Sequence, residues 1–307
     1  MNNNGAAILV DNISKSYGEI AALTGISLRV DKNTIFGLVG PDGAGKSTLI
    51  RILCGLLKPD TGNAEVLGFN LLKESAEIKN NIGYLSQKFS LYTDLSVDEN
   101  IEFLAEIHGV RNFKIKRDEL LSFTRLINFR KFLAGKLSGG MKQKLALACT
   151  LIYEPEIIFL DEPTTGVDPV SRREFWIILS NLIKRNITVF ISTPYMDEAE
   201  RFNKIALMDK GRLLTVNTPE NVKSVMIGQI LEIVCSPVRN AYRILKEKTP
   251  FEIQLFGDRI NIISAKNDLS ESYINDLLVS NFIEISGIRK KSPSLENAYI
   301  HLIKENY

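Results

Sequence analysis

The chain has 307 residues, 45% of them apolar, and its 38 basic side chains nearly balance 36 acidic ones, for a net charge of +2. This length predicts either two domains or one large domain with a smaller one. A charge so close to zero argues against the broad positive field by which many proteins grip nucleic acid. No apolar run approaches the roughly 20 residues that span a bilayer, and the first residues show no secretory signal.

The cysteines and histidines predict neither a metal centre nor disulfides. Cys54, Cys149 and Cys235 are far apart and odd in number, which is typical of small buried hydrophobic side chains in a reducing compartment. His108 and His301 are isolated in the sequence, so neither is predicted to bind a metal.

The first 39 residues predict a β-rich start. Short apolar runs at 8–10, 26–30 and 35–39 alternate with turns, as in strands joined by tight connections. Tyr17 falls in a predicted turn ahead of the second run. Its ring could stack on a purine base or simply pack against the fold, and its position does not decide between the two.

Residues 40–48 read Gly-Pro-Asp-Gly-Ala-Gly-Lys-Ser-Thr, and the spacing of their glycines from the Gly-Lys-Ser ending is that of a phosphate-binding P-loop. A predicted buried strand precedes the loop and a predicted helix over 47–57 follows it. The N-terminal end of that helix offers free N–H groups and a positive dipole to phosphate. The alternative is a glycine-rich turn that merely joins strand to helix.

A nucleoside triphosphate is the expected ligand of this loop. Gly43 and Gly45 would let the backbone curl closely around phosphate oxygens, which a Cβ would obstruct. Lys46 would bridge the β- and γ-phosphates, and the Ser47 hydroxyl would bind Mg²⁺. The residues expected around the phosphates are Gly40, Pro41, Asp42, Gly43, Ala44, Gly45, Lys46, Ser47 and Thr48.

A helical lobe is predicted after the strand at 82–86, which ends at Gln87. Ser138-Gly139-Gly140 opens its last helix. A helix N-terminus there can receive an anion, although for this motif alone an ordinary N-cap is the simpler interpretation. The predicted helices of the lobe span 97–108, 116–127 and 140–153.

Residues 157–160 are four consecutive apolar residues, which predicts a strand buried on both faces of a parallel sheet. Asp161 and Glu162 follow at its C-terminal end, where ligands bind in open α/β sheets. Asp161 is suited to hold Mg²⁺ through the water shell of the ion, and Glu162 to orient or deprotonate an attacking water. A solvated strand end is the alternative.

The remaining pattern predicts more α/β elements and then a domain boundary near 217–220. Beyond the boundary, the order strand-helix-strand-strand-helix-strand over 230–288 is that of a ferredoxin-like module, and a final helix begins at 295. Before the domain boundary, the predicted elements are a turn at 163–169, a helix over 170–184, a strand over 188–193, and a hairpin of 205–208 with 212–216.

The chain resembles the ATP-binding subunit of ABC transporters over about residues 7–217. The resemblance rests on the P-loop, on Gln87 and on the runs 137–143 and 161–169. Residues 293–299 look like part of the extension of bacterial ABC-2 type exporters, the drug-resistance and polysaccharide-export kind. The resemblance implies an α/β P-loop NTPase of the ABC ATPase fold with a β-rich N-terminal subdomain. It implies an ATPase domain over 1–217 with a helical subdomain inserted at about 88–153, and a small α+β, ferredoxin-like accessory domain over 218–307.

The resemblance also implies ATP and Mg²⁺ as cofactors and ATP hydrolysis as the reaction. Tyr17 would stack on adenine. Gln87 would reach Mg²⁺ and the attacking water while reporting to the membrane partner. Glu162 would be the general base, and Lys46 would contribute to catalysis beside it. The metal residues would be Ser47, Gln87 and Asp161.

Two such domains would enclose two ATP molecules between them, so the resemblance implies a dimer. Ser138, Gly139 and Gly140 would bind the γ-phosphate of ATP held by the opposite subunit, and Asp168 would touch that subunit. The second ATPase is either another copy of this chain or a different chain. A separate integral membrane permease, contacted through residues 87–136, would carry out export at the cytoplasmic face of the inner or plasma membrane. No nucleic-acid partner is expected.

Two rival classes of function have less support in the sequence. A soluble ABC-type ATPase that acts on ribosomes or DNA usually carries two cassettes or a long coiled-coil insertion, and neither is present. A P-loop kinase for a small molecule would leave Gln87 and the helix after Ser138 without a purpose.

One position departs from the family pattern. The family places a histidine, hydrogen-bonded to the γ-phosphate, just after the strand that corresponds to residues 188–192. This chain has Pro194 there, and proline offers neither a side-chain donor nor a backbone N–H. The expectation is that ATP binding survives and that hydrolysis is slow.

Overall fold

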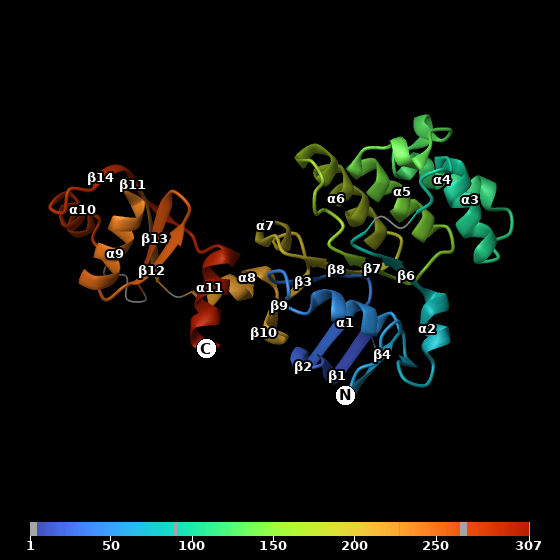
Figure 1. The fold of residues 1–307 in the computed structure, drawn as a ribbon, viewed down its shortest axis with the longest axis horizontal. Helices are drawn as coiled ribbons and strands as arrows, with labels where there is room; N and C mark the ends of the chain where they lie inside the picture. Colours follow the sequence, from blue (N-terminus) through green and yellow to red (C-terminus); the bar gives the residue numbers. More distant parts are fainter. Residues whose placement is uncertain (1–4, 89–90, 227, 265–268, 307) are drawn as a thin grey trace. The chain divides into compact units, whose positions relative to one another are not determined.

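The structure is a computed structural model that describes residues 5–88, 91–226, 228–264 and 269–306. The chain divides into two compact units, residues 1–217 and residues 218–307. Figure 1 shows the helices and strands of each.

The first unit begins with a four-stranded antiparallel sheet in the order β2-β1-β4-β5. Tyr17 is the last residue of β1 and pairs with Ile20 across the hairpin, so the prediction that Tyr17 lies in a turn was wrong. The apolar runs underestimated the lengths of β1 and β2, because long parts of these strands are half-exposed and carry polar side chains. The strands are β1 (Ala6–Tyr17), β2 (Ile20–Asp31), β4 (Thr61–Val66) and β5 (Phe69–Asn70).

A second sheet of six strands has the order β10-β9-β3-β8-β7-β6. Its neighbours are parallel except β10, which forms a hairpin with β9. Every residue of β3, β7 and β8 is buried, which is why these strands appear in the sequence as largely apolar runs. The strands are β3 (Ile35–Val39), β6 (Ile82–Leu85), β7 (Ile157–Asp161), β8 (Thr188–Thr193), β9 (Lys204–Asp209) and β10 (Arg212–Asn217).

The helices of this unit include the predicted helical lobe, in which α3, α4 and α5 gather together (Figure 1). The P-loop helix α1 ends at Leu53, four residues before the predicted end. Gly55, at a φ of 67°, turns the chain out of the helix there. The helices are α1 (Lys46–Leu53), α2 (Ser75–Asn81), α3 (Val97–Ile107), α4 (Phe113–Phe123), α5 (Gly139–Leu151), α6 (Pro169–Ile183) and α7 (Met196–Ala199), with 3₁₀ turns at Ile127–Phe129 and Ala134–Lys136.

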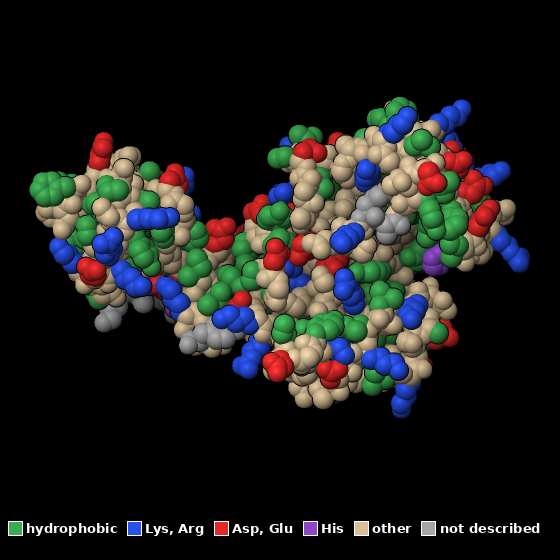
Figure 2. Space-filling model, viewed as in Figure 1, with side chains coloured by type: hydrophobic (Ala, Val, Ile, Leu, Met, Phe, Trp, Pro, Cys, Tyr) green, Lys and Arg blue, Asp and Glu red, His purple; other side chains and the backbone are tan. Residues whose placement is uncertain are grey.

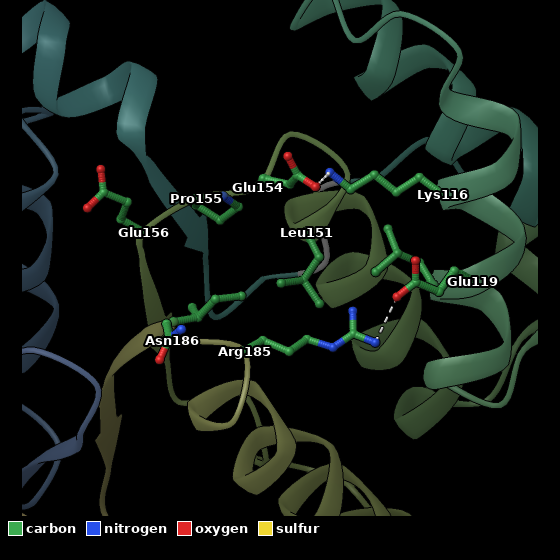
Figure 3. A pocket seen from close by; sticks show the side chains of 10 residues that line it. Lys116, Glu119, Leu151, Glu154, Pro155, Glu156, Arg185 and Asn186 are labelled. Atoms are coloured by element: carbon green, nitrogen blue, oxygen red, sulfur yellow. Dashed lines mark ion pairs between the residues drawn. The ribbon is translucent and has the colours of Figure 1, made fainter.

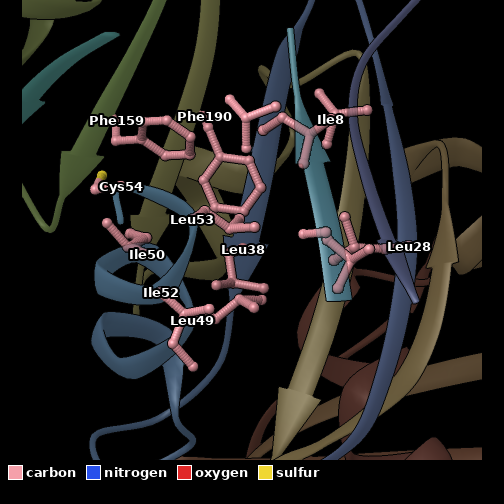
Figure 4. Close-up of a cluster of buried hydrophobic side chains, with 14 of the residues drawn as sticks. Ile8, Leu28, Leu38, Leu49, Ile50, Ile52, Leu53, Cys54, Phe159 and Phe190 are labelled. Atoms are coloured by element: carbon pink, nitrogen blue, oxygen red, sulfur yellow. The ribbon is translucent and has the colours of Figure 1, made fainter. Parts of the chain in front are cut away.

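One core joins the two sheets and α1. Leu49 and Ile50 of α1 pack with Phe159 and Phe190 of the six-stranded sheet and with Ile8 of the antiparallel sheet (Figure 4). The Phe159 and Phe190 rings lie 5.4 Å apart between centroids. Burying side chains of this size stabilises the fold by about 1.5–3 kcal/mol each. The packing fixes α1 between the sheets and thereby fixes the loop that enters it.

The second unit has the predicted strand and helix order. Its sheet has the strand order β12-β13-β11-β14 with antiparallel neighbours, which is the ferredoxin-like arrangement. Its core includes Leu231 and Ile262 from the sheet and Leu245, Ile274 and Leu278 from the helices. The elements are α8 (Pro219–Ser224), β11 (Gln229–Ser236), α9 (Val238–Lys248), β12 (Glu252–Phe256), β13 (Arg259–Ser264), α10 (Glu271–Val279), β14 (Glu284–Lys291) and α11 (Leu295–Asn306).

Basic and acidic side chains are interspersed on the face shown in Figure 2, as the near-zero net charge suggests. Within the described residues, each helix is too short or too polar to cross a bilayer.

Candidate functional site

The P-loop runs from the end of β3 into the start of α1, as predicted. Gly43 and Gly45 have φ values of 80° and 99°, a left-handed region that favours glycine. Gly45 is also the N-cap of α1, and a Cβ on it would collide with the Ala22 carbonyl oxygen. The loop backbone is therefore shaped by glycine at the positions where the pattern requires it.

Lys46 is almost fully buried at the start of α1, with 3% of its surface exposed. Its Nζ donates to the carbonyl oxygens of Gly40, at 2.8 Å, and Pro41, at 2.9 Å. The same ammonium lies 3.0 Å from Glu162 Oε1. The two carbonyl contacts hold the ammonium over its own loop, and Glu162 faces it from the end of β7.

Asp161, the last residue of β7, collects two hydroxyl groups. Its Oδ1 accepts from Ser47 Oγ at 3.0 Å and from Ser192 Oγ at 2.8 Å. Ser192 in turn accepts the backbone N–H of Glu162 at 3.0 Å. A carboxylate and a hydroxyl that converge at a P-loop are the oxygen ligands that Mg²⁺ prefers, so the residues fit that ion.

Glu162 has a φ of 50°, which is uncommon for a residue with a side chain and typical of strained positions at functional sites. Its side chain is buried, and its two oxygens have different partners. Oε1 faces Lys46, while Oε2 accepts from Gln87 Nε2 at 2.9 Å and from Thr165 Oγ1 at 3.5 Å. The three predicted catalytic side chains thus form one connected group.

A cavity of about 580 Å³ opens over this group. The P-loop, Gln87 and Glu162 form part of its wall, and the turn before β10 contributes Lys210. Its lining residues are Ile20, Ala21, Ala22, Asp42, Gly43, Gly45, Lys46, Ser47, Thr48, Gln87, Glu162 and Lys210.

Tyr17 is not among the residues that line the cavity. Its side chain is 47% exposed, and the wall on this side is made by Ile20, Ala21 and Ala22 at the start of β2. Sequence reasoning missed these three residues, because nothing in their own pattern marks them as part of a site. In this chain an apolar strand edge, and not the tyrosine ring, borders the space beside the P-loop.

Ser138, Gly139 and Gly140 are also absent from the cavity wall. Ser138 caps α5 by accepting the Met141 N–H at 3.4 Å, and a Cβ on Gly140 would collide with Ser171 of α6. Asp168 caps α6 by accepting the Ser171 N–H at 2.9 Å, and this bond lowers the pKa of Asp168. Within one chain these residues lie at the N-terminal ends of α5 and α6.

A second cavity, of about 430 Å³, lies where α4 faces the loops that follow α5 and α6 (Figure 3). Two ion pairs border it, Lys116 with Glu154 at 2.7 Å and Arg185 with Glu119 at 2.9 Å. Its lining contains none of the predicted site residues, and four of its charged side chains are paired with each other.

Sequence reasoning missed Ser192, which connects Asp161 to the backbone of Glu162. A signal was available, because a hydroxyl residue inside an otherwise apolar buried strand needs a hydrogen-bond partner. Only the pairing of β7 with β8, in which Asp161 is opposite Ser192, shows which partner it has.

The chain is similar to known proteins along most of its length. The pattern of the family described as ABC transporter matches residues 23–165. The probable multidrug ABC transporter ATP-binding protein YbhF of Escherichia coli is 42% identical over 216 residues, which are 69% of this chain and 37% of YbhF. The chain thus spans well under half the length of that relative.

Another relative matches from end to end. The daunorubicin resistance ATP-binding protein DrrA3 of Streptomyces coeruleorubidus is 34% identical over 301 residues, which cover 96% of this chain and 95% of DrrA3. This match includes the second unit as well as the first.

Solved structures confirm the predicted fold class. An ATP-binding cassette of an ABC transporter in its ADP conformation has a TM-score of 0.65 and 27% identity, covering 70% of this chain and 92% of that one. A dimeric ATP-binding cassette bound to ADP and Pi has a TM-score of 0.63 and 28% identity, covering 69% of this chain and 98% of that one. With a P-loop of the expected geometry and a full-length relative, this chain belongs to the ABC transporter family of nucleotide-binding ATPases.

Proposed function

We propose that this chain is the energising subunit of an exporter, which binds and hydrolyses MgATP and drives a separate membrane permease. The observation that carries the proposal is the connected group of Lys46, Glu162 and Gln87 in the wall of the P-loop cavity. The names of the relatives, a multidrug transporter subunit and a daunorubicin resistance protein, support export as the direction.

The contacts of Lys46 suggest how phosphate prepares the base. The β- and γ-phosphates of ATP compete for the ammonium that Glu162 Oε1 now faces at 3.0 Å. Once Lys46 turns to the phosphates, Oε1 loses its cation and becomes available to accept a proton from water. Gln87, bonded to the other oxygen, keeps the carboxylate in place during this exchange.

Ser47 and Asp161 would hold Mg²⁺, with Gln87 as the third metal residue. The bound ion supplies positive charge that neutralises the phosphate oxygens during transfer. Ser192 keeps the Asp161 carboxylate aimed at Ser47 through its 2.8 Å hydrogen bond.

A second ATPase subunit completes the site in this proposal. Ser138, Gly139 and Gly140 lie outside the cavity wall of their own chain, so they are available to contact ATP held by a partner. Asp168 at the start of α6 belongs to the same face of α5 and α6, because Gly140 packs against Ser171. The permease would contact the lobe at residues 87–136, at the cytoplasmic face of the membrane.

Turnover is expected to be slow. Pro194 has no donor for a γ-phosphate oxygen, and the loss of one such donor typically lowers the rate about 10²- to 10³-fold. If the chain pairs with itself, both sites lack the donor. If it pairs with another ATPase, the partner chain can bring one competent site.

Lys46→Ala tests the proposal. Without the ammonium, MgATP affinity and permease-dependent transport should fall sharply, while the fold persists because the loop is shaped by its glycines. Nucleotide affinity and thermal unfolding would be measured on the same samples, with Lys116→Ala as a control that removes a lysine outside the site. A folded Lys46→Ala protein with undiminished MgATP affinity would contradict the proposed function.

A further inference from the structure

A buried carboxylate on α7 has no part in the chemistry described so far. Glu198 is 1% exposed, and both of its oxygens have donors around them. Oε2 accepts from Thr193 Oγ1 at 2.7 Å and from Thr164 Oγ1 at 3.0 Å. Oε1 lies 3.4 Å from Trp176 Nε1 and 3.7 Å from Arg172 Nε.

The two threonines lie at or just beyond the carboxyl ends of β7 and β8, the neighbouring parallel strands at the site. Thr164 comes two residues after the proposed base Glu162. Thr193 ends β8, directly before Pro194. A single carboxylate oxygen therefore ties together the carboxyl ends of two strands that the sheet places side by side.

Thr193 extends this connection in two directions. Its hydroxyl accepts the Tyr195 N–H at 3.1 Å, which holds the chain just after Pro194. Its carbonyl accepts the Gly40 N–H at 3.3 Å, at the first residue of the P-loop. The Arg172 guanidinium also stacks on the Tyr195 ring, 4.7 Å from its centroid. Glu198 is thus linked to the base, to the P-loop and to the segment around Pro194.

Stability alone is a weak reason to bury this carboxylate. Removing a charge from water is unfavourable, and a well-packed apolar side chain often stabilises a fold as well or better. The hydrogen-bond partners of both Glu198 oxygens are donors. Hydrogen bonds to these oxygens therefore hold the donor side chains in fixed directions. Two of those donors come from the segments that carry Glu162 and Pro194.

We infer that Glu198 is a positioning residue for hydrolysis, which holds the Glu162 turn and the Thr193–Tyr195 segment at a fixed separation around the γ-phosphate. The inference rests on the proposed function and deepens it. Because Pro194 has no donor of its own, the placement of its neighbours decides how this side of the site meets the phosphate. Small displacements of reacting groups can lower a rate about 10²-fold.

The threonines allow a test that leaves Glu198 in place. Thr164→Val and Thr193→Val keep the side-chain shape and each remove one hydroxyl from Oε2. Trp176→Phe is the matched control, because it removes a donor from the other oxygen of the same carboxylate and lies on α6, outside both segments. Thr164→Ser and Thr193→Ser restore the hydroxyls.

Steady-state ATP hydrolysis would be measured on the full chain in its complex with the permease, at a temperature where thermal unfolding shows every variant to be folded. The valine variants should lower kcat roughly 10- to 100-fold with KM for MgATP unchanged. The serine variants should recover most of that loss, and Trp176→Phe should keep the parental kcat.

Three results would overturn the inference alone, provided that the parent hydrolyses ATP. They are parental kcat in both valine variants, no recovery in the serine variants, or an equal loss in Trp176→Phe. A parent that neither binds nor hydrolyses ATP would overturn the proposed function, and this inference with it.

Discussion

Glu162 illustrates at the scale of one residue how backbone and side chain serve the same end. Its backbone adopts a strained φ of 50°, and the Ser192 hydroxyl accepts a hydrogen bond from its N–H. Lys46 and Gln87 then take one carboxylate oxygen each. The proposed base is held by groups from three other segments of the chain.

Glu162→Gln should stop turnover while ATP stays bound. The amide keeps the size of the side chain but cannot accept the proton of water, so hydrolysis should fall at least about 10²-fold. Phosphate release and size-exclusion chromatography with MgATP would show an inactive, ATP-dependent dimer. Glu156→Gln, a neutralising change outside the site, should behave like the parent. Hydrolysis by Glu162→Gln at the parental rate would show that another group is the base.

Pro194→His should raise ATP hydrolysis in the complex with little change in ATP affinity, because it adds the missing donor at the γ-phosphate. Pro194→Ala is the control, since it restores the backbone N–H without adding a side-chain donor. Steady-state rates of the three proteins, each with the permease, separate the two effects. If the parent already hydrolyses ATP as fast as histidine-bearing relatives and Pro194→His does not raise the rate, another group stabilises the transition state.

At the scale of elements, the sheet of the second unit contains a buried acid held by its neighbouring strands. Glu232 of β11 is 1% exposed, and it lies opposite Arg289 on β14. Arg289 Nε donates to its Oε1 at 2.7 Å, and Lys291 Nζ donates to its Oε2 at 3.0 Å. Burial by itself would raise the pKa of Glu232, but the hydrogen bonds from Lys291 and Arg289 outweigh burial and lower that pKa.

Because of this lowered pKa, the stability of the second unit should depend on pH in the acid range. The stabilising contribution of Glu232 is fully present above the ordinary glutamate pKa of about 4.3, and it is lost as pH falls through the lower folded-state pKa. Glu232→Gln should reduce the free energy of unfolding at pH 7 by about 1.5–3 kcal/mol. The variant should also lose this component of the acid dependence.

Denaturant unfolding between neutral pH and pH 3 would measure both effects. Glu247→Gln, on the exposed side of α9, is the matched control and should leave the curve unchanged. An unaltered free energy of unfolding in Glu232→Gln would mean that the cationic side chains are held equally well without the charge.

At the scale of the molecule, the second unit has a core and sheet of its own. Helix α8 packs on α11 within it, and Val222 of α8 and Leu302 of α11 are both buried. We therefore expect a fragment of residues 218–307 to fold alone and to bind no nucleotide. Circular dichroism and thermal unfolding would test this, with a fragment of residues 228–307 as a less stable control that lacks α8. A disordered 218–307 fragment would contradict the domain division.

Features that depend on consecutive residues could be predicted from the sequence alone. The P-loop spacing, the apolar run ending in Asp161 and Glu162, and the strand order of the second unit can each be recognised locally, because each depends on neighbours in the chain. The same is true of the family resemblance. A buried strand of a parallel sheet has a nearly continuous apolar pattern, which can be read without knowing its neighbours.

Contacts between segments that are far apart in the chain could not be predicted in this way. Ser47 and Asp161 are 114 residues apart, and Ser192 and Asp161 are 31 apart, yet all three share hydrogen bonds. The order of β3, β8 and β7 in the sheet creates these contacts, and strand order is a long-range property that periodicity does not encode. Tyr17 lies at the end of β1 and not in a turn, because the strand continues through half-exposed polar residues beyond its apolar run. The contacts of Glu198, on which its proposed role rests, likewise come from segments that no local pattern connects.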